Sequence, residues 1–418
     1  MPDVEIRNPF RPGAGHMPPY LAGREHESEA FKTALQQDVI LKNIILTGLR
    51  GLGKTVLLEK FKPIAMHAGW LWAGTDLSEA ASISEDNLVT RILTDLAIAT
   101  TSISVGVRST QRPGFTEEPN TQAVRLNYPT LRAIYDNTPG LAADKLKSVL
   151  EYVWPFVERS GRRGIVFAYD EAQNLSDHAT KEQYPLSLLL DVFQSIQRKG
   201  LRMMLVLTGL PTLFPKLLAT RTCTERMFHI VFLGPLDKTE TGEAIRKPIV
   251  DSGCPMEISE SSLQTIWDIT RGYPYFVQYV CREVFDVWVQ SVERDESPRQ
   301  IPTWEIIQKL DSDFFAGRWA KATDRQRDLL RIISHLPNCD SEFTVQEVVE
   351  HSINQLKAKG FSSSHVNQML SSLSELGLIY KNRHGKYSFA VPLLGAFIRR
   401  QEEQGMPPID EDQGELFP

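Results

Sequence analysis

Four cysteines are few for a chain of 418 residues, and no two of them have the CxxC spacing of a redox dithiol or a pair of zinc ligands. The chain is also far longer than the small scaffolds that depend on disulfides for stability. These absences exclude a CxxC redox motif and a CxxC zinc site. We expect most of the cysteines to be reduced thiols in the hydrophobic core.

Long apolar runs are missing as well. No stretch reaches the roughly 18 apolar residues that a membrane-spanning helix needs, and the most hydrophobic window, residues 203–215, is interrupted by Thr208 and Thr212. Residues 1–7 lack the basic start and the continuous apolar core of a secretory signal. The sequence therefore predicts no membrane partner and a cytoplasmic protein.

An excess of positive charge is also absent, because 46 Lys and Arg residues are set against 52 Asp and Glu residues, a net charge of −6. Overall charge therefore gives no argument for nucleic-acid binding, although a local basic surface is compatible with it. Hydrophobic residues (42%) and charged residues (23%) have the frequencies of an ordinary folded protein. At roughly 150 residues per domain, the chain is long enough for two to three domains.

The most specific motif present is a glycine-rich loop, residues 48–55, which matches the pattern G-x-x-x-x-G-K-[ST]. The apolar run 43–47 precedes it, as expected of a strand buried on both faces, and a helix-like stretch follows it. The alternative is a simple glycine-rich turn, which would not need this strand, loop and helix order. The loop predicts nucleotide binding by Gly48, Leu49, Arg50, Gly51, Leu52, Gly53, Lys54, Thr55 and Val56.

Each part of this loop has a physical role. Glycines allow the backbone N–H groups to wrap phosphate oxygens, and the N-terminus of the following helix adds its positive dipole. We expect Lys54 to reach the β- and γ-phosphates and Thr55 to ligate a metal ion. The predicted cofactors are ATP and Mg²⁺.

Two adjacent acids, Asp170 and Glu171, follow the buried apolar run 164–169. In P-loop NTPases an Asp at the end of a strand helps to hold Mg²⁺, so Asp170 is the second expected metal ligand. Glu171 would then lie beside the phosphates, where it could polarise the attacking water as a general base. The alternative is that both acids cap the next helix, because acids favour helix N-termini.

Other candidate catalytic residues follow later in the chain. Thr208 ends a fourth strand, which would bring its hydroxyl to the same sheet edge as Asp170, near the γ-phosphate or the water; alternatively it only marks the strand end. Arg221 and Arg226 lie in the next connection, and either could be an arginine finger acting on a neighbouring subunit's nucleotide, with Arg226 favoured. The alternative for both is an exposed, solvated arginine.

Strands and helices alternate as far as residue 234, and helices follow to about residue 317. In the last unit, helix-like stretches at 324–335, 344–351 and 364–376 precede two short strand-like runs around a polar turn at 380–389, which is the order of a winged helix. This order predicts an α/β fold in which a P-loop NTPase core with a parallel sheet is joined to a helical lid and a C-terminal winged-helix domain. Residues 102–139 contain four prolines and little periodicity, which indicates an insertion. The expected divisions are a lead-in with a first helix (1–42), the core (43–234), the lid (235–317), the winged-helix domain (318–400) and an acidic disordered tail (401–418).

From Asn8 to about Arg400 the sequence resembles the AAA+ and STAND P-loop ATPases, in particular the origin-recognition-complex-like ATPases of prokaryotes. Residues 21–25, Leu-Ala-Gly-Arg-Glu, look like the box of that family that helps to seat the adenine, which implies that Gly23 and Arg24 contact the nucleotide. The loop 48–55 and Asp170-Glu171 look like the Walker A and Walker B motifs. The resemblance also implies a sensor-one role for Thr208 and the finger position for Arg226.

The segment Gly272-Tyr273-Pro274 is similar to the G-x-P motif of STAND lids, which implies that Pro274 packs near the base. Origin-recognition proteins carry a sensor-two arginine a few residues after this glycine. This sequence has Tyr275, Phe276 and Val277 there instead. The departure puts direct γ-phosphate sensing by the lid in doubt.

The C-terminal region has a local excess of positive charge, since residues 351–400 contain seven Lys and Arg residues and one Glu. Lys381, Arg383 and Lys386 cluster in the turn expected to form the wing, where cations can contact DNA phosphates. In the alternative, the domain packs on the core or on a protein partner and these charges are solvated.

Two functions follow from these motifs. The first is an ATP-binding and ATP-hydrolysing switch that binds duplex DNA through its winged helix and assembles into a homo-oligomer when ATP is bound. The second is a STAND-like signalling or scaffold ATPase, in which the C-terminal module binds a protein partner and exchange of ADP for ATP sets the state.

Overall fold

The structure is a computed structural model of the chain. The residues that it describes are 7–13, 15–110, 120–220, 224–294, 301–356, 360–383 and 385–405. Arg221 and most of the predicted acidic tail therefore lie outside the described residues.

The core is a five-stranded parallel sheet with the strand order β2-β5-β6-β1-β7. Its strands are β1 (Asn43–Thr47), β2 (Trp70–Ala73), β5 (Gly164–Tyr169), β6 (Met203–Gly209) and β7 (Phe228–Phe232). Every residue of β1, β5 and β6 is buried, which explains why these strands are apolar runs without alternation. The sheet confirms the predicted α/β fold class with a parallel P-loop core.

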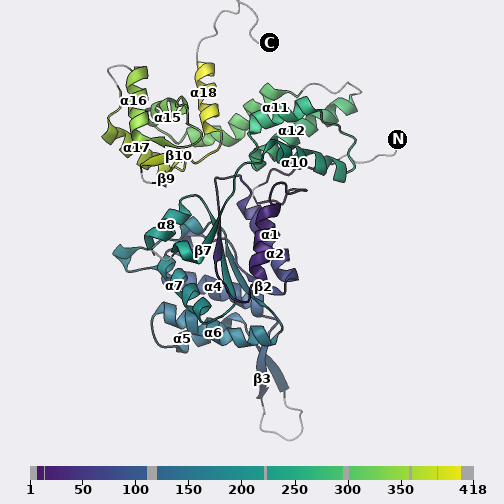
Figure 1. The fold of residues 1–418 in the computed structure, drawn as a ribbon, viewed down its shortest axis with the longest axis vertical. Coiled ribbons are helices and arrows are strands. Elements are labelled where there is room, and N and C mark those ends of the chain that lie inside the picture. The colour runs from purple at the N-terminus through teal and green to yellow at the C-terminus, as the bar shows by residue number, and fades with distance from the viewer. Residues whose placement is uncertain are drawn as a thin grey trace, which may run out of the picture.

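Helices cover both faces of this sheet (Figure 1). Successive strand residues point to opposite faces, so Ile44 and Leu46 pack with one set of helices and Ile45 packs with the other. Phe31 of α1 and Phe61 of α2 stack with ring centroids 4.1 Å apart on the first face. The first face is covered by α1 (Glu25–Leu35) and α2 (Lys54–His67), and the second by α4 (Glu85–Thr100), α6 (Ala142–Arg159) and α7 (Pro185–Arg198).

Residues 102–139 are more regular than their sequence indicates. Strands β3 (Ser104–Thr110) and β4 (Asn120–Arg125) form an antiparallel hairpin that projects from the core at the end away from the lid (Figure 1). Helix α5 (Tyr128–Asn137) follows and is capped by the Asn127 side chain, which accepts a hydrogen bond from the Thr130 N–H at 3.1 Å. Pro129 lies in the first turn, where a helix tolerates proline. The described parts of this region therefore form regular elements, and its assignment as an insertion stays a prediction.

Short elements complete the core. They are α3 (Glu79–Ser82), the 3-10 turns η1 (Ala172–Asn174) and η2 (Ala179–Lys181), α8 (Leu213–Thr220) and α9 (Thr224–Met227).

Between β7 and residue 319 the described elements are all helical, in agreement with the sequence. The lid consists of α10 (Lys238–Asp251), α11 (Glu260–Thr270), α12 (Pro274–Glu293) and α13 (Thr303–Leu310), and a π-helical segment, η3 (Asp311–Ala316), leads through α14 (Gly317–Trp319) to the next unit. Helix α10 begins with a capping box between Asp237 and Glu240. Among the described helices, none combines the length and the apolar character needed to cross a membrane.

The C-terminal unit has the element order expected from the sequence. Its helices and strands are α15 (Asp324–Ser334), β8 (Phe343–Thr344), α16 (Val345–Leu356), α17 (Ser363–Glu375), β9 (Ile379–Arg383), β10 (Lys386–Phe389) and α18 (Leu394–Gly405). The strands form a small antiparallel sheet in the order β8-β10-β9. Lid and C-terminal helices share one hydrophobic cluster, so the division at residue 318 stays a prediction.

Candidate active site

A cavity of about 490 Å³ lies where the core, the lid and the lead-in segment meet. Its walls come from the glycine-rich loop, the lead-in residues 11–21, the start of α12, and two residues beyond the lid helices, Phe314 and Arg318. The cavity is at the carboxyl edge of the parallel strands, the usual place for a ligand in an open α/β sheet. This position makes it the candidate active site.

The glycine-rich loop has the backbone geometry of an anion site. Gly53 has φ +85° and forms the N-cap of the 14-residue helix α2, so the loop delivers the helix N-terminus to the cavity. Gly51 has φ +80°, and an added Cβ there would lie 3.1 Å from the Cβ of Tyr275. Glycine is needed at Gly51 both for its left-handed conformation and for the close approach of the lid.

Lys54 is almost completely buried at the base of the cavity. Its Nζ donates hydrogen bonds to the carbonyl oxygens of Gly48 and Leu49, both at 2.9 Å. Burial lowers the pKa of Lys54 to about 8, although Glu171 and Asp170 oppose this shift. A bound anion would stabilise the charged form, so the amine is placed to bind phosphate.

Asp170 is the hydrogen-bond acceptor for several polar groups at the edge of the sheet. Its carboxylate accepts hydrogen bonds from the hydroxyls of Thr55 and Thr208, and from the backbone N–H of Glu171 at 2.7 Å. Asp76 at the end of β2 pairs with Asp170 through a parallel bridge. Burial, followed by the charges of Asp170 and Glu171, raises the pKa of Asp76.

Glu171 is the carboxylate that faces the cavity. It has φ +52° and ψ +34°, a left-handed conformation that costs a non-glycine residue roughly 1–3 kcal/mol and that concentrates at functional sites. Its side chain accepts a hydrogen bond from Gln173. Lys216 donates to the carbonyl oxygens of Gln173 and Leu175, at 2.6 and 3.0 Å, and so fixes the turn that carries Glu171.

Glu171 is the only acid that lines the cavity among the described residues, whereas several cations do. Arg11 and His16 come from the lead-in, Arg50 and Lys54 from the glycine-rich loop, and Arg318 from the far side of the lid. The excess of positive charge favours a polyanionic ligand.

The lead-in segment is tied down over this cavity. The side-chain amide of Asn8 donates to the carbonyl oxygen of Arg282 at 3.0 Å and to Asp286 at 2.8 Å, both on α12. The Arg11 N–H donates to Gln278 of the same helix at 3.1 Å, and Phe10 is buried in the lid core. The lead-in therefore forms one wall of the cavity and is bonded to the lid helix α12.

Gly23 and Arg24 are outside the cavity wall. Arg24 is buried, and its guanidinium donates to the carbonyl oxygens of Gly23 (2.9 Å), Leu52 (3.3 Å) and Gly234 (2.7 Å). Its structural role is therefore to join the lead-in, the glycine-rich loop and the entry to the lid. The nucleotide contact that the family resemblance implies for Gly23 and Arg24 stays a prediction.

The cavity wall includes only part of the remaining predicted set. Arg50, Gly51, Gly53, Thr55, Val56 and Pro274 line it, whereas Gly48, Leu49 and Leu52 do not. Leu52 instead packs in the hydrophobic core on the α1 and α2 face of the sheet.

Two predicted catalytic residues also do not reach the cavity. Thr208 is fully buried and donates a hydrogen bond to the Asp170 carboxylate, so it can position that carboxylate, and its predicted contact with the γ-phosphate or the water stays a prediction. Arg226 is exposed in α9, just before Phe228, which pairs with Asn43 at the amino end of β1. The glycine-rich loop leaves the opposite end of β1, so Arg226 is remote from the cavity of its own chain.

The lid contacts the loop through the residues that stand where a sensor arginine was expected. The Tyr275 N–H donates to the Gly51 carbonyl oxygen at 3.1 Å, and the Tyr275 and Phe276 rings pack edge to face with centroids 5.6 Å apart. Sequence reasoning missed the contributions of Arg11, His16 and Arg318. No local pattern marks them, because the fold alone brings these distant segments together.

The site fits ATP and Mg²⁺. Its volume is within the roughly 300–1,000 Å³ of small-ligand pockets, and its cations suit a triphosphate. Thr55 and Asp170 are the residues that would hold Mg²⁺, which would neutralise phosphate charge there when bound. No cluster of three His, Cys, Asp or Glu side chains suited to a metal occurs among the described residues, and Mg²⁺ at phosphates needs only one or two carboxylates.

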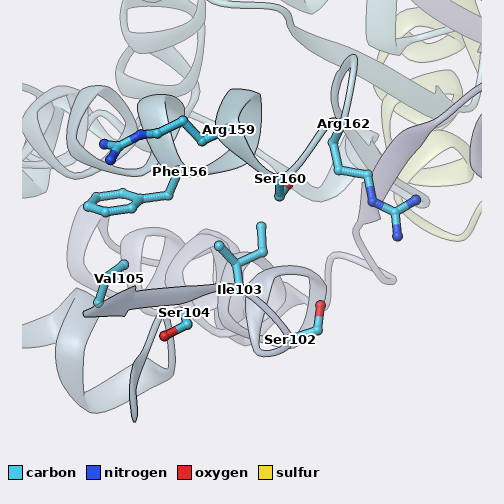
Figure 2. Close-up of a pocket in the computed structure, with 8 residues that line it drawn as sticks. All are labelled: Ser102, Ile103, Ser104, Val105, Phe156, Arg159, Ser160 and Arg162. Atoms are coloured by element: carbon cyan, nitrogen blue, oxygen red, sulfur yellow. The ribbon is translucent and has the colours of Figure 1, made fainter. Parts of the chain in front are cut away.

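A second cavity, of about 340 Å³, lies at the base of the β3–β4 hairpin. Figure 2 shows that the guanidinium groups of Arg159 and Arg162 point away from its centre, which leaves serine hydroxyls and Ile103 facing the space. Arg159 instead stacks on Phe156, with its guanidinium carbon 4.8 Å from the ring centroid. This cavity therefore lacks convergent charged groups and is a poor candidate for catalysis.

The predicted DNA-contact residues are on the small sheet of the C-terminal unit. Lys381 on β9 is exposed, and Lys386 on β10 is half-buried. Lys386 pairs with Arg383 in the antiparallel register, although the Arg383 side chain is not among those described. The exposed face of α17 presents Ser364, His365, Asn367, Gln368 and Ser371.

Comparison with known proteins supports the fold. A protein-family model described as a domain of unknown function, DUF8462, matches residues 312–398. No curated protein matches the sequence. The Walker-type ATPase PABY2304 of Pyrococcus abyssi is 16% identical, with 91% of this chain and 96% of that chain covered and a TM-score of 0.54.

The ORC2 protein of Aeropyrum pernix in its ADP form is 12% identical, with 93% of this chain and 97% of that chain covered and a TM-score of 0.51. Both similarities extend over nearly the whole chain, as the sequence resemblance does. The chain therefore has the fold of these two solved structures, a Walker-type ATPase and an ORC2 protein.

Proposed function

We propose that this protein is a switch that binds and hydrolyses ATP between its core and its lid, with Mg²⁺ as the metal. The observation that carries the proposal is the convergence of Lys54, Glu171 and the glycine-rich loop on one cationic cavity. The parallel-sheet fold of P-loop ATPases agrees with it.

The residues divide the work of hydrolysis. Backbone N–H groups of the loop and Lys54 bind the phosphates. Asp170, whose carboxylate accepts a hydrogen bond from Thr208, is a ligand for the metal ion. Glu171 accepts the proton of the attacking water, since it is the carboxylate exposed to the cavity. Gln173 holds the Glu171 carboxylate in place.

The first experiment is steady-state ATP hydrolysis by the wild type and Glu171→Gln over a range of protein concentrations. We expect the variant to retain ATP binding and to lose turnover. Glu182→Gln is the matched control, because Glu182 is an exposed glutamate with nearly the same backbone conformation, φ +54°, outside the cavity wall. Equal turnover by wild type and Glu171→Gln would remove Glu171 as the base.

We infer further that the protein assembles when ATP is bound and that Arg226 then acts on the nucleotide of a neighbouring copy. Its exposure and its distance from the cavity of its own chain support this role. The rate per subunit should rise with protein concentration in wild type and not in Arg226→Ala. A monomer with every nucleotide, and turnover unaffected by Arg226→Ala, would count against assembly.

We propose that the C-terminal unit is a winged helix and that its partner is duplex DNA. The exposed polar face of α17 suits the major groove, and Lys381 and Lys386 on the neighbouring strands suit phosphates. Glu342 and Glu347 lie beside these strands, because Asn382 donates to Glu342 and the Lys386 charge helps to lower the pKa of Glu347.

Titration with duplex DNA at several salt concentrations tests this partner. The variant Lys381→Ala/Arg383→Ala/Lys386→Ala should bind more weakly, with a salt dependence smaller by about two to three counterions. Lys42→Ala/Lys60→Ala/Lys62→Ala is the charge-matched control on the core. Salt-insensitive binding, or equal losses in the two variants, would argue against the wing as a DNA contact.

The second candidate is a STAND-like ATPase whose C-terminal module binds a protein partner. The observation that favours it is the aromatic Tyr275 at the start of α12, where hydrolytic relatives are expected to have an arginine. Under this alternative, the wild type binds ATP and turns it over no faster than Glu171→Gln with or without DNA.

A further inference from the structure

The segment that joins the lid to the C-terminal unit forms part of the active-site wall. Phe314, in the π-helical segment, and Arg318, in α14, line the same cavity as Lys54 and Glu171. Single π-helical turns inside helical regions recur at functional sites. The C-terminal unit is therefore joined to the lid by residues that face the ligand.

Aromatic rings fix the direction of Arg318. Its Nη1 donates to the Phe314 carbonyl oxygen at 2.6 Å, and its guanidinium carbon lies 4.3 Å from the centroid of the Phe314 ring. That ring is 5.4 Å from the Tyr275 ring and 4.9 Å from the Phe276 ring, centroid to centroid. The half-buried guanidinium is therefore held by packing before any ligand binds.

Contacts across the cavity connect Arg318 to the glycine-rich loop. Its guanidinium packs on the Phe314 ring, that ring packs on the Tyr275 ring, and the Tyr275 N–H donates to the Gly51 carbonyl oxygen. Gly51 belongs to the loop whose Lys54 is expected to reach the β- and γ-phosphates. The charge of Arg50, on the same loop, helps to lower the pKa of Arg318 after the larger effect of burial.

Arg318 has unused hydrogen-bond donors at the cavity. Within the described part of the chain, its Nε and Nη2 have no acceptor in the protein, and the exposed Arg50 has none either. Glu171 and Asp170 offset part of the charge of Lys54, which already donates to two backbone carbonyl oxygens. A phosphate group would accept from the unused Arg318 donors and reduce the remaining repulsion among the cations.

The same segment is bonded to the C-terminal unit. Arg400 of α18 binds Asp311, the first residue of the π-helical segment, through two hydrogen bonds, one of them 2.8 Å long. Phe315 stacks on Phe397 of α18 with ring centroids 5.1 Å apart. A shift of Arg318 therefore moves residues that α18 contacts.

We propose that Arg318 binds the terminal phosphate of ATP and thereby couples the nucleotide state to the C-terminal unit. This inference rests on the proposed ATP-binding function. It assigns to the junction the phosphate contact that the start of α12 does not supply.

Equilibrium binding of Mg·ATP and Mg·ADP to the full chain tests the contact. In Arg318→Gln we expect ATP affinity to fall at least about tenfold, an interaction of the size typical for charge-assisted hydrogen bonds, and ADP affinity to change less than about twofold. The ATP affinity of Arg318→Lys should lie between those of wild type and Arg318→Gln. Arg325→Gln is the control, because Arg325 stacks on Phe361 in the C-terminal unit, 5.2 Å from the ring centroid.

Equal losses of ATP and ADP affinity in Arg318→Gln would overturn the assignment, and so would unchanged affinities. A wild type that binds neither nucleotide overturns the proposed function, and with it this inference. Thermal denaturation without nucleotide shows whether Arg318→Gln is folded, because a misfolded variant would lose ADP binding as well as ATP binding. If Arg318→Gln is misfolded, the ATP and ADP affinities of Arg318→Lys, which keeps the charge and the aliphatic stem, decide whether Arg318 contacts the terminal phosphate.

Amide hydrogen exchange tests the coupling. In wild type, residues 311–319 and α18 should exchange more slowly with ATP than with ADP, and in Arg318→Gln this difference should vanish. Retention of the full difference in the variant would show that the nucleotide state reaches the C-terminal unit by another route.

Discussion

The backbone N–H of Tyr275 donates a hydrogen bond to the carbonyl oxygen of Gly51, with a distance of 3.1 Å between nitrogen and oxygen. The first turn of the lid helix α12 is thus bonded to the middle of the phosphate-binding loop. The Tyr275 side chain also approaches Gly51 so closely that a Cβ there would be crowded. A change in the loop on nucleotide binding must therefore reach the lid.

Replacement of Gly272 by alanine should loosen this lid. Gly272 has φ +72°, and an added Cβ would lie 2.0 Å from the Leu236 carbonyl oxygen. We expect a loss of about 2–4 kcal/mol in the free energy of unfolding, from backbone strain and the clash together, and weaker ATP binding. Urea denaturation and nucleotide titration measure the two effects.

Gly253→Ala is the matched control for that change. Gly253 has a similar φ of +67° and no atom within 4 Å of an added Cβ. It should lose only about 1 kcal/mol from backbone strain and keep its ATP affinity. Equal behaviour of the two variants would show that the contact with Leu236 is unimportant.

Thr208→Val should reduce ATP turnover at least about tenfold, because Asp170 loses a hydrogen bond to its carboxylate. ATP binding should change little, since Thr208 does not line the cavity. Thr47→Val on the neighbouring strand is the control. The Thr47 hydroxyl is buried and without a hydrogen-bond partner in the structure, so its loss should not slow turnover. A Thr208→Val enzyme with normal turnover would contradict the positioning role.

ATP affinity should fall with rising pH near pH 8. Burial lowers the pKa of Lys54 to about 8 in the protein without nucleotide, and only the protonated amine attracts phosphate. Binding therefore has its full strength below pH 8 and should weaken about tenfold between pH 7 and pH 9. Isothermal titration of Lys54→Met should show weaker binding and no such fall. The idea fails if wild type and variant share one pH profile.

Asp95 should make stability depend on pH. Burial raises the pKa of Asp95 to about 6, against the opposing charge of Arg91, and its Oδ2 and the buried Tyr169 hydroxyl have no hydrogen-bond partner in the structure. The protonated form is favoured in the folded state. The stability that the folded state gains by protonation of Asp95 is complete below the ordinary pKa of 3.8 and is lost as the pH rises through 6.

Asp95→Asn, which is always neutral, should therefore gain stability relative to wild type between pH 4 and pH 7.5, as urea denaturation would show. Asp38→Asn is the control, because Asp38 is exposed. Its difference from wild type should not change with pH. If the stability difference between Asp95→Asn and wild type is also independent of pH, the pH dependence of stability does not come from Asp95.

Local sequence determined the parts of the site that are contiguous in the chain. The glycine-rich loop is recognisable because its glycines, Lys54 and Thr55 must occur at fixed spacing for a backbone to wrap phosphates. Asp170 was found because a buried strand must be apolar and must end where the chain meets the ligand. The strands themselves were visible as apolar runs for the same reason.

Tertiary structure decided the rest. The sequence could not show that the Arg24 guanidinium donates hydrogen bonds to backbone carbonyl oxygens, or that the Thr208 hydroxyl donates to Asp170. These contacts join residues up to 210 positions apart. The hairpin β3–β4 was hidden because its pairing, unlike a helix, leaves no strong local period in a polar sequence. Arg318 lines the same cavity as Lys54 only because the lid folds back onto the loop at Gly51, which no spacing of residues along the chain could indicate.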